Sequence, residues 1–82
     1  MPKAREAAIF GNVVRNVRKG YEWTQEDLAE RSGLTTTYVG QVERGDKTPS
    51  LTVVLKLAHA LNVLPSELLE SFGFVVQRGL WK

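Results

Sequence analysis

The chain of 82 residues contains no cysteine, which excludes disulfide bonds and metal sites built from thiolates. Its single histidine, His59, has no second histidine or cysteine with which to share a zinc ion. Apolar runs long enough to span a membrane are missing, and so is a signal peptide. These absences predict a cytoplasmic protein with no metal, no other cofactor, no small-molecule ligand and no contact with a membrane.

Patterns typical of enzymes are also missing. Glu26, Asp27 and Glu30 form an acidic group, but acidic residues at a helix start usually interact with the helix dipole. Ser50 and Ser66 begin predicted helices, and neither has a base in reach that would make it a nucleophile. The glycines do not have the spacing of a phosphate-binding loop. We therefore expect no catalytic residues and no enzymatic activity.

A large excess of one charge is absent as well. The 11 basic and 9 acidic side chains give a net charge of only +2. This balance excludes a polycation that binds nucleic acids without regard to sequence, so any DNA binding must depend on where the charges lie. The length is that of one small domain with a single core, too small for a deep enzyme cleft.

What the chain does contain, near its middle, is a pair of short helix patterns joined by a glycine. Thr24 is suited to cap the first helix, and Gly33 supplies a left-handed residue that ends it. Thr35 offers a second cap, for a helix from Thr36 to about Arg44. Two such helices separated by a few residues cross at a steep angle and leave the second one exposed.

This second helix divides into two faces when its positions are stepped at about 100° per residue. Val39 and Val42 point towards the core. Thr37, Gln41 and Arg44 point outwards, and side chains of these types read base edges or hold phosphates. The outward face therefore favours DNA as the ligand of this helix.

Residues from about Phe10 to Leu69 resemble the helix-turn-helix domain of phage repressors and Cro proteins, the Xre family. The resemblance is carried by Arg18, Thr24 to Ala29, Gly33 to Thr35, Tyr38, Val39, Val42 to Gly45, Pro49 to Leu51, Leu55, Leu57, Ala58, Ala60, Leu61 and Pro65 to Leu69. It implies an all-α fold, a compact five-helix lambda-repressor-like domain. It also implies a transcriptional regulator that binds double-stranded DNA as a homodimer on a two-fold symmetric operator.

The size of the chain is similar both to Cro-like phage regulators and to the small controller proteins of restriction-modification operons. The sequence does not distinguish these two classes, nor a repressor from an activator. A protein-interaction module, such as an antitoxin or adaptor that uses this fold to hold a partner protein, is the alternative from another class. The outward face argues against it, because a surface for a protein partner should carry large apolar side chains.

The resemblance also assigns the DNA contacts, with the second helix of the pair in the major groove. The predicted contacts are to bases or adjacent phosphates (Thr36, Thr37, Tyr38, Gln41), to phosphates from helix starts (Gln25, Thr35) and to the backbone (Arg44, Lys47, Thr48). Arg44 and Lys47 are also long enough to reach a base edge. The family positions of Arg18 and Glu43 imply a partly buried ion pair beneath this helix.

Apolar spacing predicts the other helices of a domain over residues 6–71, preceded by a basic N-terminal arm, residues 1–5. The first helix runs roughly from Glu6 to Lys19. A fourth helix follows the cap Ser50 and ends near Asn62, and a fifth begins near Pro65. The predicted inner face of the fourth helix consists of Leu51, Val54, Leu55, Ala58 and Leu61.

Two positions depart from the family pattern. Glu22 stands where a glycine is usual, two residues before the first cap, and Gly20 lies two positions earlier. This departure predicts a displaced end of the first helix. Leu64 stands where a serine or threonine cap is common before Pro65, and its side chain cannot accept a hydrogen bond from the helix start.

Residues 72–82 are too apolar for a disordered tail. Phe72, Phe74 and Val76 alternate as in a strand, so we expect a short strand here. Gly73 and the apolar Val75 weaken this pattern. The extension either folds back over its own domain or forms a dimerisation segment. The second interpretation is favoured, because proteins of this class bind two half-sites as dimers. The predicted dimer contacts are Leu68, Phe72, Phe74, Val76 and Trp81.

Overall fold

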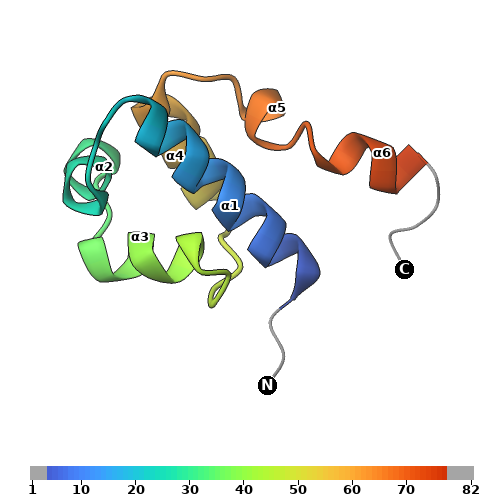
Figure 1. The fold of residues 1–82 in the computed structure, drawn as a ribbon, viewed down its shortest axis with the longest axis horizontal. Helices are drawn as coiled ribbons and strands as arrows, with labels where there is room; N and C mark the ends of the chain where they lie inside the picture. The colour runs from blue at the N-terminus through green and yellow to red at the C-terminus, as the bar shows by residue number, and fades with distance from the viewer. Residues whose placement is uncertain (1–3, 78–82) are drawn as a thin grey trace.

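The structure is a computed structural model that describes residues 4–77. These residues form helices and no strand (Figure 1). The helices are α1 (Arg5–Gly20), α2 (Gln25–Ser32), α3 (Thr36–Glu43), α4 (Leu51–Leu61), α5 (Pro65–Leu68) and α6 (Phe72–Gln77). The predicted all-α fold is confirmed. Arg5, which the sequence placed in the basic arm, is the first residue of α1.

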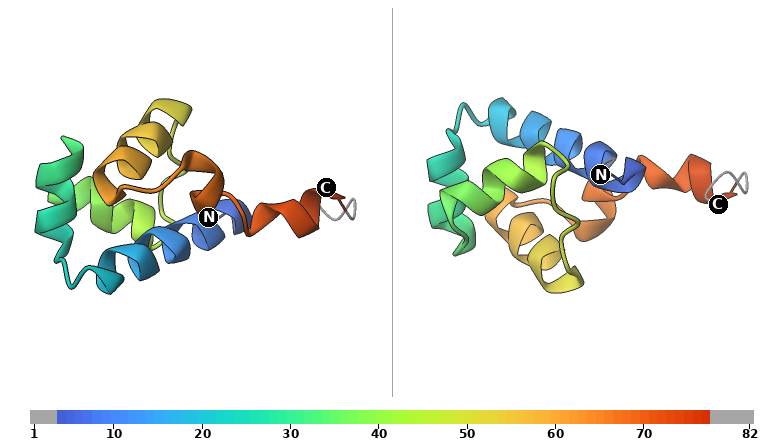
Figure 2. Two further views of the ribbon diagram at one scale, coloured as in Figure 1. Left: turned by 90° about the horizontal axis from the view of Figure 1, so that it is seen from above. Right: turned by 90° about the horizontal axis from the view of Figure 1, so that it is seen from below.

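One core joins α1 to α5. α1 packs against α3, α4 and α5, while α2 packs against α3 and α4 (Figures 1 and 2). The side chains that are most completely removed from solvent are Val14, Leu28, Val39, Val42, Leu57, Leu61 and Leu68. Because they come from all five helices, the short helices α2 and α3 depend on this shared core for their stability.

The expected C-terminal strand is wrong, because its residues form α6. Phe72 and Val76 lie one turn apart on this helix, and both line an apolar groove of about 290 Å³ together with Ala7 and Phe10 of α1. Helical spacing brings these two side chains to one face, which alternation in a strand would also have done. Figure 2 shows α6 extending away from the other five helices.

The predicted inner face of α4 is partly wrong. Leu51 is 72% exposed and Leu55 is 48% exposed, whereas Leu57 is buried at 1%. Apolar residues occupy so many positions of α4 that two adjacent faces both fit a helical stripe. Packing against α1 and α2 selects the face of Leu57 and Leu61, and Leu51 and Leu55 are left on the surface.

A close approach of two helices occurs at Gly11, where α1 crosses the end of α3. A Cβ atom at this position would collide with the carbonyl oxygen of Val42 and would lie 2.7 Å from that of Glu43. Only glycine lets the two backbones approach this closely. The crossing sets the depth at which α3 sits against the domain.

The end of α1 differs from the expectation of a displaced helix. α1 continues to Gly20, and Glu22 itself takes the left-handed conformation, with φ of 62°. This is the conformation for which glycine is usual, so a glutamate here bears some backbone strain. At the start of α5 the amide of Leu64 donates to Glu67 Oε1 (3.0 Å), so the glutamate satisfies this amide although Leu64 provides no cap.

Candidate nucleic-acid interface

The start of α2 is held by a reciprocal pair of hydrogen bonds. Thr24 Oγ1 accepts from the Asp27 amide (3.1 Å), and Asp27 Oδ2 accepts from the Thr24 amide (2.8 Å). This is a capping box, which satisfies amides that the helix cannot pair internally. The bond from the Thr24 amide, followed by the Thr24 hydroxyl, lowers the pKa of the Asp27 carboxyl. The predicted cap at Thr24 is present.

Three residues connect α2 to α3. Gly33 has φ of 72° and ends α2, and the Leu34 amide donates to the Ala29 carbonyl (3.0 Å). Thr35 Oγ1 then accepts from the Tyr38 amide (3.1 Å) and caps α3. Its hydroxyl hydrogen remains available to donate to a phosphate. The two predicted helices and their turn therefore form a helix-turn-helix unit.

The end of α3 is equally well defined. Gly45 has φ of 77°, and its amide donates to the Val42 carbonyl (3.0 Å) while the Asp46 amide donates to the Gln41 carbonyl (2.9 Å). This pair of bonds is a Schellman motif. A Cβ atom on Gly45 would lie 2.8 Å from Ala8 Cα, so α1 excludes any side chain at this position.

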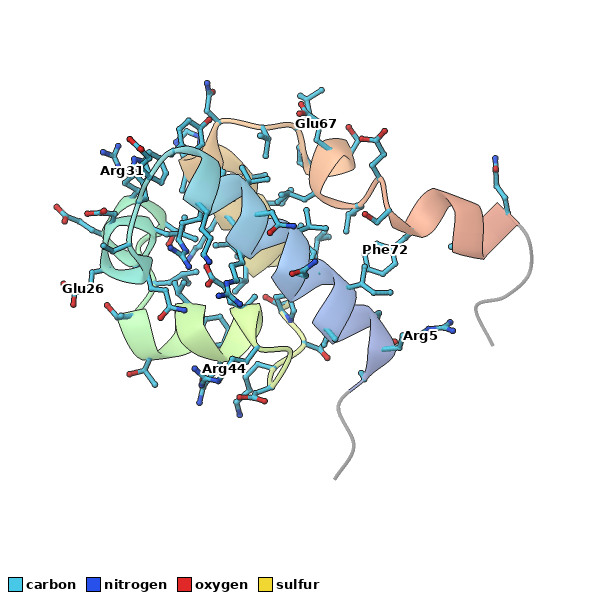
Figure 3. All side chains as sticks on the ribbon, in the orientation of Figure 1. Arg5, Glu26, Arg31, Arg44, Glu67 and Phe72 are labelled. Atoms are coloured by element: carbon cyan, nitrogen blue, oxygen red, sulfur yellow. The ribbon has the colours of Figure 1, made fainter. Side chains whose placement is uncertain are left out.

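The two faces of α3 are divided as the spacing predicts. Val39 and Val42 are each 1% exposed, and α3 forms an outer edge of the molecule (Figure 1). In Figure 3 the Arg44 side chain lies on the side of α3 that faces away from α1. Among the residues predicted to contact DNA, those that are exposed are Thr35, Thr36, Thr37, Arg44, Lys47 and Thr48, and those that are half-buried are Gln25, Tyr38 and Gln41.

Beneath this face the structure brings Arg18 and Glu43 together, as expected from the sequence. Arg18 Nε donates to Glu43 Oε2 (2.7 Å) and Nη2 donates to Oε1 (2.9 Å), so the pair is bidentate. The side chains are only 9% and 2% exposed. The hydrogen bonds to Glu43 raise the pKa of the Arg18 guanidinium, and Arg18 Nη1 also donates to the Trp23 carbonyl (2.6 Å).

Gln25 joins this buried pair to the exposed face. Its Nε2 donates to Glu43 Oε1 (3.0 Å), so a group predicted to hold a phosphate also interacts with the scaffold. The Gln25 side chain reaches α3 at Gly40, where a Cβ atom would lie 3.4 Å from Gln25 Oε1 and 3.1 Å from Arg44 Nη1. Gly40 thus leaves room on α3 for two polar side chains.

Asp46 is a member of this surface that the sequence analysis did not identify. Its Oδ2 accepts a hydrogen bond from Arg44 Nε at 3.0 Å. A signal was present in the sequence, since an acid two residues after an arginine across a helix-ending glycine can turn back towards it. The sequence analysis did not single out Gly40 either, because the position of the Arg44 guanidinium beside it depends on side-chain conformation.

The residues predicted to form the dimer contact are not equivalent. Leu68 is 0% exposed in the core of its own domain, so its assignment to a dimer contact is wrong. Phe72 is half-buried and Val76 is 60% exposed, which leaves surface for a partner. The side chain of Phe74 and the whole of Trp81 lie outside the described residues.

Residues 4–77 contain no group of three histidine or acidic side chains that could hold a metal ion. In the same range, no helix has both the length and the apolar character needed to cross a membrane.

Comparisons with known proteins agree with this geometry. Residues 14–68 match the family HTH_3, described as Helix-turn-helix. The control protein C.SmaI of Serratia marcescens is 39% identical over 71 residues, which are 87% of this chain and 84% of that protein. A Bacillus subtilis protein named as the uncharacterized HTH-type transcriptional regulator YazB is 36% identical over 63 residues, 77% of this chain and 91% of its own length.

A solved structure is similar over nearly its full length. The restriction-modification controller protein C.AhdI from Aeromonas hydrophila superposes with a TM-score of 0.77 at 45% sequence identity. The superposition covers 79% of this chain and 98% of the C.AhdI chain.

Proposed function

The chain belongs to the HTH_3 helix-turn-helix family of transcriptional regulators, and from this premise we propose that it binds double-stranded DNA sequence-specifically, as a homodimer on a two-fold symmetric operator. The observation that carries the proposal is α3 itself. It is capped at both ends, lies at an outer edge of the molecule and exposes Thr36 and Thr37 to solvent, while Gln41 is half-buried. A helix presented in this way fits the major groove.

The proposed contacts fall on two kinds of DNA group. Thr37 and Gln41, one turn apart on α3, would face base edges, with Thr36 and Tyr38 beside them. The helix starts at Gln25 and Thr35 and the loop residues Lys47 and Thr48 would hold phosphates. Phosphate contacts fix the position of α3 on the duplex, and base contacts then discriminate between sequences.

The homodimer is supported by apolar side chains that the domain leaves uncovered. Leu51 and Leu55 lie one turn apart on α4, and further apolar surface follows around α5 and α6, where the exposed residues are Leu64, Leu69 and Val76. Exposed apolar side chains of this kind favour a protein–protein contact when they lie together on one surface. We place the dimer contact on this surface together with Phe72, Phe74 and Trp81, in place of the buried Leu68.

Among the two regulator classes, the relatives favour a controller of a restriction-modification operon. C.AhdI is a restriction-modification controller, and C.SmaI of Serratia marcescens and C.BamHI of Bacillus amyloliquefaciens are named control proteins. Their similarity extends over 76% or more of this chain in each case. The regulated gene in this proposal is therefore one that encodes a restriction enzyme, a methyltransferase or the regulator itself.

Selection of bound duplexes from a random DNA pool tests the proposal. We expect enrichment of an inverted repeat whose half-sites lie about 34–36 Å apart, one helical turn, so that two α3 helices meet successive major grooves. Sedimentation with and without the selected duplex gives the oligomeric state. No enrichment at low salt would reject DNA recognition, and enrichment of a single half-site by a monomer would reject the dimer alone.

A further inference from the structure

The apolar groove beside α6 is built mainly by parts of the chain that lie outside the helix-turn-helix unit. Its volume is about 290 Å³, and it lies where α6 meets the start of α1 and the loop after α3. Most of the described residues that line it fall outside residues 14–68, which match the HTH_3 family: Glu6, Ala7, Phe10, Leu69, Phe72 and Val76. The family fold alone therefore does not account for this groove.

The groove is continuous with the apolar surface on which we place the dimer contact. Leu69, 41% exposed, and Val76, 60% exposed, belong both to that surface and to the lining of the groove. A second copy packed on the surface would therefore also lie at the mouth of the groove. An occupant supplied by that copy would remove further apolar area from water, which favours association.

The chain itself carries a segment whose side chains suit such a groove. Residues 78–82, which lie outside the described part of the structure, contain Leu80 and Trp81 between an arginine and a lysine. Tryptophan is enriched among the anchors that fill pockets at protein interfaces. Among the described residues that line the groove, Glu6 is the one that carries a charge, and it is opposite in sign to the two residues that flank the apolar pair.

The direction of α6 favours a groove on another molecule as the site for this segment. The helix extends away from the other five helices (Figure 2), while Phe10 and Val54, only 4% and 8% exposed, lie deep in the groove of the same chain. To reach them, the chain would have to reverse its direction directly after Gln77. Trp81, in contrast, can extend up to about 13 Å beyond the end of α6, which is enough to cross to a second copy packed on this surface.

We propose that the groove receives the side chains of Leu80 and Trp81 from a second copy of this chain. The exchange is reciprocal, because two copies related by a two-fold axis present the same groove and the same segment to each other. This inference rests on the homodimer of the proposed function and adds to it the contact that anchors the two copies.

The first test uses the whole chain without DNA, so its result does not depend on DNA recognition. Isotope-labelled and unlabelled protein are mixed in equal amounts, and NMR is used to detect nuclear Overhauser effects that arise only between two copies. We expect such effects between the Trp81 indole ring of one copy and the Val54 methyl groups of the other. Effects confined to one chain would show that the segment folds back over its own domain, and this result would overturn the proposal.

The second test measures the dissociation constant of the dimer by sedimentation. Trp81→Ala should raise it by at least about thirtyfold, the effect of losing one aromatic anchor. Val76→Lys should act in the same direction, because it places a charge in the groove at a position that is exposed and therefore not needed for folding. Asn16→Lys, exposed on α1 beyond the groove, adds the same charge and should leave the dissociation constant unchanged.

A mixture of the two variants distinguishes exchange between copies from docking within one copy. Trp81→Ala keeps an intact groove, and Val76→Lys keeps an intact segment. A mixed dimer has one intact contact where each pure variant has none, so the mixture should contain more dimer than either variant alone. A mixture that shows no such gain would overturn the exchange.

The same measurements separate the failure of this inference from the failure of the proposed homodimer. A native dimer whose dissociation constant is the same in Trp81→Ala and in Val76→Lys would overturn the groove contact, and the homodimer would then depend on the exposed leucines of α4 and α5. A native chain that sediments as a monomer at all concentrations would reject the homodimer and the exchange together.

Discussion

Arg18 of α1 and Glu43 of α3 form a bidentate ion pair that is almost completely removed from solvent. Removal of one partner leaves the other charge buried without compensation. We expect Arg18→Met and Glu43→Leu each to lower the free energy of unfolding by about 3 kcal/mol, measured in urea. The double variant removes both charges and should recover much of this loss. Single variants with an unchanged melting temperature would show that the pair does not matter for stability.

Gly11 and Gly20 both lie on α1 but differ in the space around them, so one can serve as the control for the other. A methyl group at Gly11 would collide with the backbone of α3, whereas the space around Gly20 is open within 4 Å. We expect Gly11→Ala to lower the free energy of unfolding by about 1–3 kcal/mol, because a rigid backbone must move. Gly20→Ala should instead raise it by up to about 1 kcal/mol, because alanine favours the helix. Equal effects of the two substitutions on the free energy of unfolding would mean that α1 and α3 do not approach each other closely at Gly11.

Glu22 offers a stabilising substitution, because it holds a left-handed backbone with φ of 62°. Glycine takes this conformation without the clash of a Cβ atom, so Glu22→Gly should raise the melting temperature, with a gain of up to about 1 kcal/mol. Gly33, at φ of 72°, provides the converse control, since Gly33→Ala should destabilise the protein by a similar amount. A lower melting temperature for Glu22→Gly would show that the glutamate side chain matters more than its backbone.

The Asp27 carboxyl, at the start of α2, makes the stability of the fold depend on pH. The Thr24 amide and hydroxyl lower the pKa of its carboxyl below the ordinary value of 3.8, so the native state binds this proton less readily than the unfolded chain. The stabilisation is therefore present above the ordinary value and is lost as the pH falls below it. Thermal melts from pH 6 downwards should show a smaller acid loss in Asp27→Asn than in the native protein. An equal acid loss in the two proteins would contradict this role of Asp27.

Local signals explain which parts of this structure could be predicted. Thr24, Gly33 and Thr35 act within a few residues of their own position, so the caps and the turn of the helix-turn-helix follow from the sequence. The buried face of α4 does not, because its many apolar residues fit two faces and tertiary packing selects one. Gly11 illustrates a further limit, since the sequence carries no sign of which helix crosses there.

On the outward face of α3, likewise, some features could be predicted from the sequence and others could not. The outward direction of Thr37 and Gln41 follows from helical spacing. The neighbours of Arg44 do not, because the bond to Asp46 and the position over Gly40 depend on side-chain conformation and on a left-handed turn. Leu68 was misassigned for a similar reason, because an apolar residue near the end of a domain is equally suited to a core and to an interface.

Substitutions of Gln41 and Lys47 test sequence specificity and overall DNA affinity separately. Gln41 lies one turn after Thr37 on the outward face of α3, where its amide can make a bidentate bond with adenine. Lys47 is exposed in the loop after α3, where its ammonium group can pair with a phosphate. We expect Gln41→Ala to lose roughly 1–3 kcal/mol of preference at one base pair. Lys47→Ala should instead weaken binding to all sequences alike and lower the salt slope by about one unit. Competition gel shifts with point-substituted duplexes measure the first effect, and salt titrations measure the second. If Gln41→Ala weakens selected and random DNA equally, Gln41 only positions the helix, and Tyr38 or Arg44 becomes the principal reader of the bases.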